Sequence, residues 1–515
     1  MEELNSRENI IYMNETVFDG QTEQGVELDY VLPDYYPDIF KVLKCCLSPK
    51  VVSYSVAGDS KLMLDGVVYI KVLYLSEDSS AVHCIEQRYT YSKIVEIGRK
   101  SVSLCGTPAV TITPRTDYCN CRAVSSRRVD VRGAVSCKIR VSGNTRAELP
   151  NIPDGLEVKS SEIMCCGETL TAEKQFSVRE EIETGAPGID YIVTCDTVPR
   201  ITDVRIIADK AVVKGTVTVN ALYGVHNPEG SGCVDMEKMS AEIPVSQILD
   251  INGITDEHLC LPELYAMNCE LLPKADSGII SCELLVLCRV RAQLEETAVI
   301  PTDAYSTEYE TDLTAVQLKI PTEPRIVSQQ FTVRTNLTCD SGEVESVWEC
   351  RSELRDLMCR PKSESELLLT GQICSQAMGK AGGLPCFMEK QEAFEQVIPA
   401  ANIGSNTVID HSACVTDTGF SIRPDGTLDV SAQIEFTGSI HSMKTVEAIN
   451  SVAIHEDKPK EKDGEYALRI FYASGCEDCW SIAKRYNTTV EAILSENELE
   501  SGDAKVSGMV LIPTI

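Results

Sequence analysis

The two-residue period of a half-buried β-strand runs through most of this chain. The clearest run, from Leu428 to Phe436, places an apolar residue at every second position and a polar residue between each pair. Successive side chains of a strand point to opposite faces, so this pattern predicts strands with one face in a core and the other in solvent. Residues 135–141 and 280–288 alternate in the same way. The sequence therefore predicts a mainly β, antiparallel protein.

Two glycine landmarks recur along the chain and divide it into repeats. Three alternating runs follow glycine turns at Gly133, Gly278 and Gly426, and three earlier strands open at Gly66, Gly215 and Gly371. Both landmarks recur at intervals of about 150 residues, far longer than a solenoid unit. We expect three repeated antiparallel β domains of sandwich or barrel type, with boundaries 1–160, 161–305 and 306–452, the third being the most divergent.

The charge and the chain start limit the possible partners and location. The 515 residues carry a net charge of −31, so we expect binding neither to nucleic acid nor to an anionic membrane surface. The N-terminal stretch Met1–Glu15 is polar and lacks the apolar region of a signal peptide. No window approaches about 18 uninterrupted apolar residues, so no membrane insertion is expected. These features favour a cytoplasmic protein.

The sequence contains no pattern typical of a catalytic or metal site. Its six histidines form neither an HExxH nor an HxxxH motif. The MGKAGG run at Met378 lacks the first glycine and the hydroxyl residue of a phosphate loop, which favours a hairpin turn. We expect a protein that is not an enzyme, with no catalytic residue, no metal and no cofactor.

Cysteine is unusually frequent, at 23 residues. The adjacent pairs Cys45-Cys46 and Cys165-Cys166 point to opposite faces of a strand and do not easily chelate one metal ion. In a chain without a signal peptide we expect reduced thiols, many of them serving as small apolar core residues.

The composition changes after residue 452. Residues 453–465 are charged and predict a linker, and residues 466–515 suffice for one very small module. Within it, Cys476-x-x-Cys479 stands before a helical run, which is typical of a redox dithiol or of half a zinc site. A thioredoxin-like site needs a larger sheet and a zinc site needs two further ligands nearby. We therefore favour a turn that has the spacing by coincidence.

The small module is predicted to have the order β-α-α-β, and it resembles the LysM domain. The run CWSIAKRYNTTVEAILSENEL resembles the family's two helices, and Asn497 and the closing VLIP fall on further family positions. The resemblance implies binding of N-acetylglucosamine-containing glycan through the turn before the tryptophan and the loop after the second helix. Here Cys476, Glu477 and Asp478 replace the usual Gly-Asp-Thr of that turn. We expect glycan binding at Cys476, Glu477, Asp478 and Asn497 to be weak or absent.

Two earlier segments resemble the SPOCS domain: Val31–Cys45, which reads VLPDYYPDIFKVLKC, and Val198–Val217. Repeated SPOCS domains followed by one LysM domain are the layout of SipL-like proteins of sporulating clostridia. The resemblance implies a spore-coat morphogenesis adaptor in the mother cell, at the forespore surface. Its implied partners are a SpoIVA-like coat-basement ATPase and other coat proteins, and its role is to tether the coat to the forespore.

We expect the LysM-like head to bind its protein partner through Trp480, Ile482, Lys484, Arg485 and Tyr486. Large aromatic residues surrounded by charges are the usual anatomy of a protein interface. The alternative for the apolar members of this set is the core of a module with few hydrophobic residues to spare.

Two other functions remain open for the whole chain. One is a peptidoglycan-binding protein of the cell or spore envelope, in which the head keeps its glycan affinity. The other is a dithiol redox protein that uses Cys476 and Cys479.

Overall fold

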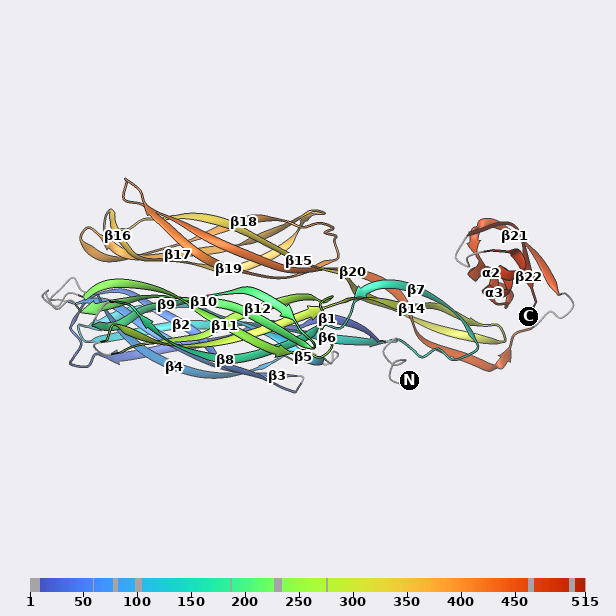
Figure 1. Ribbon diagram of the computed structural model, residues 1–515, viewed down its shortest axis with the longest axis horizontal. Helices are drawn as coiled ribbons and strands as arrows, with labels where there is room; N and C mark the ends of the chain where they lie inside the picture. Colours follow the sequence, from blue (N-terminus) through green and yellow to red (C-terminus); the bar gives the residue numbers. More distant parts are fainter. Residues whose placement is uncertain are drawn as a thin grey trace.

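The computed structural model describes residues 10–58, 60–76, 82–97, 104–185, 188–226, 234–274, 277–461, 467–499 and 505–514. The architecture is almost entirely antiparallel β, which confirms the predicted fold class. A body of packed sheets narrows into a stalk, and a small module with two helices lies at the far end of that stalk (Figure 1). No helix in the described ranges is long and apolar enough to cross a membrane.

The body contains three modules, each made of two three-stranded antiparallel sheets. The strands of module one are β1 (Ile10–Val31), β6 (Arg128–Glu148) and β5 (Cys105–Ser125), and β2 (Ile39–Ala57), β3 (Lys61–Ser76) and β4 (Val82–Glu96). Those of module two are β8 (Leu170–Glu183), β13 (Ile279–Gln293) and β12 (Leu259–Pro273), and β9 (Ile189–Ile206), β10 (Lys210–His226) and β11 (Val234–Asp250). Those of module three are β15 (Tyr309–Leu337), β20 (Leu428–Pro459) and β19 (Thr407–Ile422), and β16 (Val344–Ser363), β17 (Glu366–Ala381) and β18 (Leu384–Pro399).

Within a module the two sheets pack face to face through their apolar sides, as the alternation predicts. In module one, Val131 and Val135 of β6 share a core with Leu64 and Val68 of β3. Each of these side chains is almost fully buried. A sandwich of this kind buries the apolar face of both sheets and leaves their polar faces for solvent or for neighbouring modules.

β-Bulges at matching positions show that all three modules follow one plan. The first strand of the second sheet has several bulges in each module, and one of them leaves Leu43, Val193 or Trp348 without a partner opposite it. These three bulged residues lie in a single apolar cluster that joins the modules. A bulge bends its strand and re-aims a side chain. The repeated bulge thus supplies each module with a side chain for a shared centre.

The stalk consists of two antiparallel ribbons that continue strands of the body. β7 (Leu156–Cys166) pairs with β14 (Glu295–Ser306), and the outer part of β15 pairs with β20 up to Pro459. Their inner faces enclose a second core, which includes Ile163, Ile300 and Ile320.

These ribbons change two of the expected divisions of the chain. The division expected between residues 160 and 161 falls inside β7. Residues 453–459 of the expected linker belong to β20, where Pro459 pairs with Tyr309. Charged residues suit this position because the end of a two-stranded ribbon is open to solvent. Residues 462–466 of that expected linker lie outside the described ranges.

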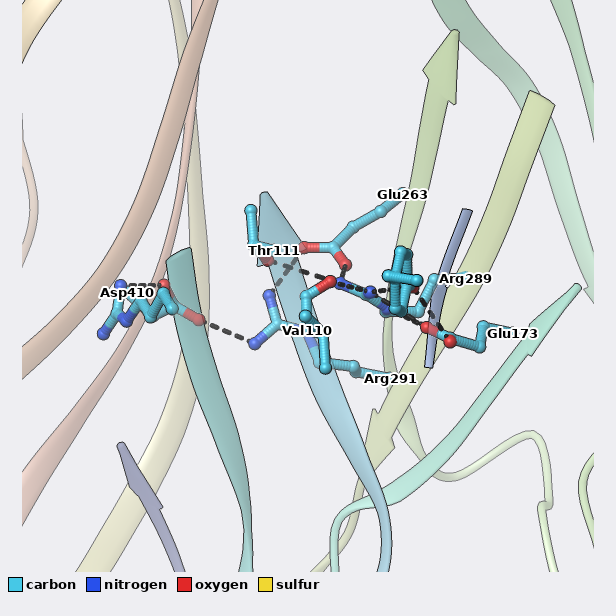
Figure 2. A network of polar contacts seen from close by, with 9 residues as sticks. Val110, Thr111, Glu173, Glu263, Arg289, Arg291 and Asp410 are labelled. Carbon is cyan, nitrogen blue, oxygen red and sulfur yellow. Dashed lines mark hydrogen bonds and ion pairs between the residues drawn. The ribbon is translucent and has the colours of Figure 1, made fainter. Parts of the chain in front are cut away.

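A polar network joins residues of all three modules (Figure 2). Arg289 of β13 is 1% exposed. It donates to the Glu173 carboxylate at 2.9 Å, to the Val110 carbonyl and to the Thr111 hydroxyl at 3.3 Å. Because Val110 and Thr111 belong to β5, this one guanidinium joins modules one and two. A buried charge is tolerated only when it is paired in this way.

The network continues from Arg289 into module three. Glu263 lies between Arg289 and Arg291, at 3.4 Å and 2.7 Å. Arg291 donates to Asp410 of β19 at 2.6 Å, and Arg140 of β6 donates to the other oxygen of the same carboxylate at 2.7 Å. Asp410 therefore receives one arginine from module one and one from module two.

We predict that acid weakens this junction through Asp410. Burial raises the pKa of Asp410, but the guanidiniums of Arg291 and Arg140 outweigh it and hold the pKa below its usual range. A carboxyl with a lowered folded pKa stabilises above its unfolded pKa of about 3.9, and this contribution is lost as pH falls through the folded value. Asp410→Asn should lower the melting temperature at pH 6 and flatten its fall toward pH 3. Identical melting profiles against pH for the variant and the parent protein would contradict this.

Candidate binding site in the C-terminal head

The head is a two-stranded antiparallel sheet with two short helices packed on one face. Its elements are β21 (Leu468–Asp478), α2 (Cys479–Tyr486), α3 (Val490–Asn497) and β22 (Lys505–Pro513). Asp478 caps α2, because its carboxylate accepts from the Ser481 N–H at 2.9 Å. Thr489 caps α3 in the same way, accepting from the Ala492 N–H at 3.1 Å. Short polar residues at these positions satisfy helix N–H groups that lack a partner within the helix.

The core of the head contains Ile482, which the sequence predicted to bind a protein partner, and Cys479, which belongs to the redox alternative. Ile482 is fully buried, so its predicted part in a protein-binding surface is wrong. Cys479 is also fully buried, and burial, with the Asp478 charge beside it, raises the pKa of its thiol. Cys476 is exposed and both thiols are free. Because disulfide exchange needs an accessible thiolate, this geometry gives no support to a CxxC dithiol.

One face of α2 contacts the stalk through one carboxylate of β14. The Trp480 indole N–H donates to Asp303 at 2.8 Å, and the Lys484 ammonium donates to its other oxygen at 2.6 Å. Asp303 lies at a β-bulge that follows Pro301. Two of the predicted partner-binding residues are thus held by the chain's own stalk.

Tyr305 extends this contact into the core of the head. Its side chain is 1% exposed and belongs to the same apolar cluster as Ile482. Its ring lies edge-on to Trp480, with 5.0 Å between ring centres, and its hydroxyl donates to the Thr488 carbonyl at 2.7 Å. Beside it, Lys159 of β7 forms an ion pair with Asp478 at 3.0 Å. We call this contact of Lys159, Asp303 and Tyr305 with the head the joint.

The other predicted protein-binding residues interact within the head. Arg485 forms an ion pair with Glu477 and lies over the Phe471 ring. Tyr486 packs against the same ring at 5.7 Å between ring centres, and Arg469 lies over it. Arg485 and Tyr486 therefore support β21 from the helix side.

The residues expected to form a residual glycan turn also have structural partners. The Asn497 amide donates to the carbonyls of Ile493 and Leu511 and accepts from the Leu511 N–H. Glu477 pairs with Arg485, and Asp478 is shared by the helix cap and Lys159. Cys476 alone of the four is exposed. Residues 500–504, which follow α3 in the sequence, lie outside the described residues.

Comparison with protein families shows what the modules and the head are. The family model described as SipL, SPOCS domain, matches residues 38–123 and 188–270, and the LysM domain model matches residues 477–513. The chain carries SPOCS domains and a C-terminal LysM domain. This is the layout of SipL-like proteins, as the sequence predicted. No curated protein and no solved structure matched the chain.

The matched SPOCS segments lie in modules one and two, and module three shares their architecture outside the match. SPOCS and LysM domains are non-catalytic binding domains, and together they support a sporulation-related adaptor or envelope-binding protein. Among the described residues, no group of three or more His, Cys, Asp or Glu side chains is placed to hold a metal ion.

The LysM head presents an apolar surface that the sequence interpretation missed. On the face of the sheet away from the helices, Leu468, Ile470 and Tyr472 of β21 and Met509 of β22 are exposed by 43%, 59%, 74% and 57%. Tyr472 pairs with Met509 and Ile470 with Leu511, so their side chains share one face. We call Leu468, Ile470, Tyr472 and Met509 the outer face.

A signal for the outer face is present in the sequence. The strand ALRIFYA is apolar at both its odd and its even positions. Two helices can cover only one face of a two-stranded sheet, so the second apolar set has to meet solvent or a partner. Exposed apolar clusters of this kind mark interaction surfaces.

Proposed function

We propose that this chain is a non-enzymatic adaptor in the assembly of the spore coat. In this proposal the outer face of the LysM head binds a protein, a SpoIVA-like coat-basement ATPase. The SPOCS body and the stalk hold that head at the far end of a long molecule and contact other coat proteins. The chain thereby tethers the coat to the forespore surface in the mother cell.

The single observation that carries the proposal is the apolar outer face. Leu468, Ile470, Tyr472 and Met509 form a compact set of large side chains without polar groups among them except the tyrosine hydroxyl. Protein interfaces combine such an apolar centre with a polar rim, and tyrosine is common among their energetically dominant residues.

The state of the turn and of α2 supports a protein partner over a glycan. Recognition of a sugar needs polar side chains that are free to bond hydroxyl and acetamide groups. Glu477, Asp478 and Asn497 already bond other groups of the chain, and Trp480 is bonded to Asp303. Binding of peptidoglycan by this head is therefore the alternative that the experiment below separates from the adaptor role.

We predict that the combined change Ile470→Ala and Tyr472→Ala weakens binding of a SpoIVA-like ATPase by about 30-fold or more. Truncating central interface residues costs about 2 kcal/mol or more, and about 1.4 kcal/mol corresponds to a tenfold change in affinity. Both side chains are exposed, so the fold and its melting temperature should stay unchanged. The measurement is a titration of the full chain against the ATPase.

Ser474→Ala serves as the matched control, because Ser474 is exposed on the same strand but offers no apolar anchor. It should leave affinity for the ATPase unchanged. Equal affinity of the double variant and the parent chain would remove the outer face from the proposal. Micromolar binding of chitin oligomers, with no binding of the ATPase, would favour the peptidoglycan-binding alternative.

A further inference from the structure

Two cysteine positions are repeated in the matched SPOCS segments. A shift of about 150 residues brings Cys45 onto Cys195 and Cys119 onto Cys269 without a gap. Each pair consists of one residue in the first strand of the second sheet, β2 or β9, and one in an edge strand of the other sheet, β5 or β12. The same two-residue arrangement is thus built twice in one chain.

The β-bulges confirm this equivalence and extend it to module three. Cys45, Cys195 and Cys350 each stand two residues after the bulged residue of the shared apolar cluster, which is Leu43, Val193 or Trp348. Beyond the bulges of β5, β12 and β19, the equivalent position holds Cys119, Cys269 and Thr418. Module three therefore keeps the first cysteine and has threonine in place of the second, which makes it an internal control.

In modules one and two the cysteines of each pair lie in one apolar cluster. Cys119 and Cys121 pack against the cluster that contains Cys45, and these two neighbouring thiols raise the pKa of Cys45. Cys195, Cys269 and Cys282 likewise share a cluster, in which the neighbouring Cys195 thiol raises the pKa of Cys269 and the Cys282 sulfur lies 3.7 Å from that of Cys269. The described residues provide no arrangement that could hold a metal ion. Thiol chemistry between the paired cysteines is what these contacts allow.

We propose that Cys45 with Cys119, and Cys195 with Cys269, are redox-active pairs, each of which closes to a disulfide that joins the two sheets of its SPOCS module. The oxidant is a low-molecular-weight disulfide, RSSR. The thiolate of one cysteine of the pair, Cys119 in module one, attacks one RSSR sulfur, forming a mixed disulfide and releasing RS⁻. The other cysteine of the pair, losing its proton, displaces the remaining RS⁻, so one RSSR is reduced to two RSH and one protein disulfide forms.

Exposure assigns the attacking residue in module one. Cys119 is only partly buried, whereas Cys45 is buried. The neighbouring Cys45 thiol lowers the pKa of Cys119, as it does that of Cys121. A stabilised, reachable thiolate is what exchange with a small disulfide requires.

Oxidation would cross-link the two sheets of each of these SPOCS modules and stabilise the module without changing its fold. Each bond ties together strands that lie far apart in the sequence, and constraining a long loop of the unfolded chain favours the folded state. A chain assembled with reduced thiols would thus become harder to unfold once an oxidant reached it.

The test is oxidation of the full-length, reduced chain with glutathione disulfide under native conditions. We expect four thiols to be lost, and mass spectrometry of the alkylated digest should identify Cys45–Cys119 and Cys195–Cys269 links, with Cys350 still reduced. The melting temperature should rise by about 5 °C or more.

Matched variants separate the paired cysteines from their neighbours. Cys119→Ser should abolish the first link while Cys121→Ser leaves it intact, and Cys195→Ser should abolish the second while Cys282→Ala leaves it intact. Melting of the reduced variants checks that each is folded. The proposal is overturned if the folded chain keeps all its thiols after treatment with glutathione disulfide. It is also overturned if the disulfides found are Cys45–Cys121 and Cys269–Cys282.

Discussion

Replacing Tyr305 with alanine is expected to detach the LysM head from the stalk and to destabilise it. Tyr305 comes from β14 of the stalk, yet its side chain is buried in the core of the head and contacts Trp480. Truncating a buried aromatic residue to alanine costs about 3–5 kcal/mol. The loss should fall on the head, whose own core is small.

The measurement uses Trp480 as a local probe. The chain has two tryptophans, so in a Trp348→Phe background the fluorescence reports the joint alone. We expect Tyr305→Ala to shift the denaturant midpoint of this signal to a much lower concentration. Tyr305→Phe keeps the ring and loses the bond to the Thr488 carbonyl, at a cost of about 1–3 kcal/mol.

Tyr472→Ala is the matched control for the joint, because that tyrosine is exposed on the outer face. It should leave the Trp480 transition where it is. If Tyr305→Ala also leaves the transition unchanged, then the head is not held by the joint.

The second large effect is expected from Arg289→Ala at the junction of the modules. Removing this guanidinium leaves the Glu173 and Glu263 carboxylates without their shared partner and the Val110 carbonyl without its donor. Breaking a buried ion pair by removing one partner typically costs about 3–5 kcal/mol. Denaturant unfolding of the full chain, followed by circular dichroism, measures this loss.

Arg179→Ala is the matched control for Arg289→Ala. Arg179 lies on β8 and pairs with Glu283, which is on β13 like Arg289. The side chain of Arg179 is 77% exposed. Exposed ion pairs contribute little to stability, so the midpoint should not move measurably. Equal midpoints for Arg289→Ala and the parent chain would show that the modules are held by their apolar contacts alone.

The repeats of the fold could be predicted because they are encoded locally. Alternation such as that from Leu428 to Phe436 sets both the strand and the face it buries, and glycine landmarks set the period. The fusion of the modules could not be predicted in this way. Arg289, Arg291 and Asp410 occupy outward positions of alternating strands, where a charge normally indicates solvent. Contacts between modules bury Arg289 and leave Arg291 and Asp410 only partly exposed.

Two of the residues predicted to bind a partner, Trp480 and Lys484, contact the stalk of the same chain. An aromatic residue and a cation on one helix indicate an interface, and Trp480 and Lys484 do form one. Their partner is Asp303 of the same chain, far away in sequence, and nothing local to either segment reveals the pairing. Sequence patterns register that a side chain is suited to an interface, but they do not say whether the interface is internal.

Hydrogen–deuterium exchange of the full chain, with and without a SpoIVA-like ATPase, shows which face of the head the partner covers. We expect slower exchange in β21 and β22, which carry the outer face, and unchanged exchange in α2 and in the stalk strands β7 and β14. Protection of α2, accompanied by faster exchange in β7 and β14, would contradict it, because the partner would then bind the face that the joint occupies. Protection of the head by chitin oligomers and not by the ATPase would contradict the adaptor role itself.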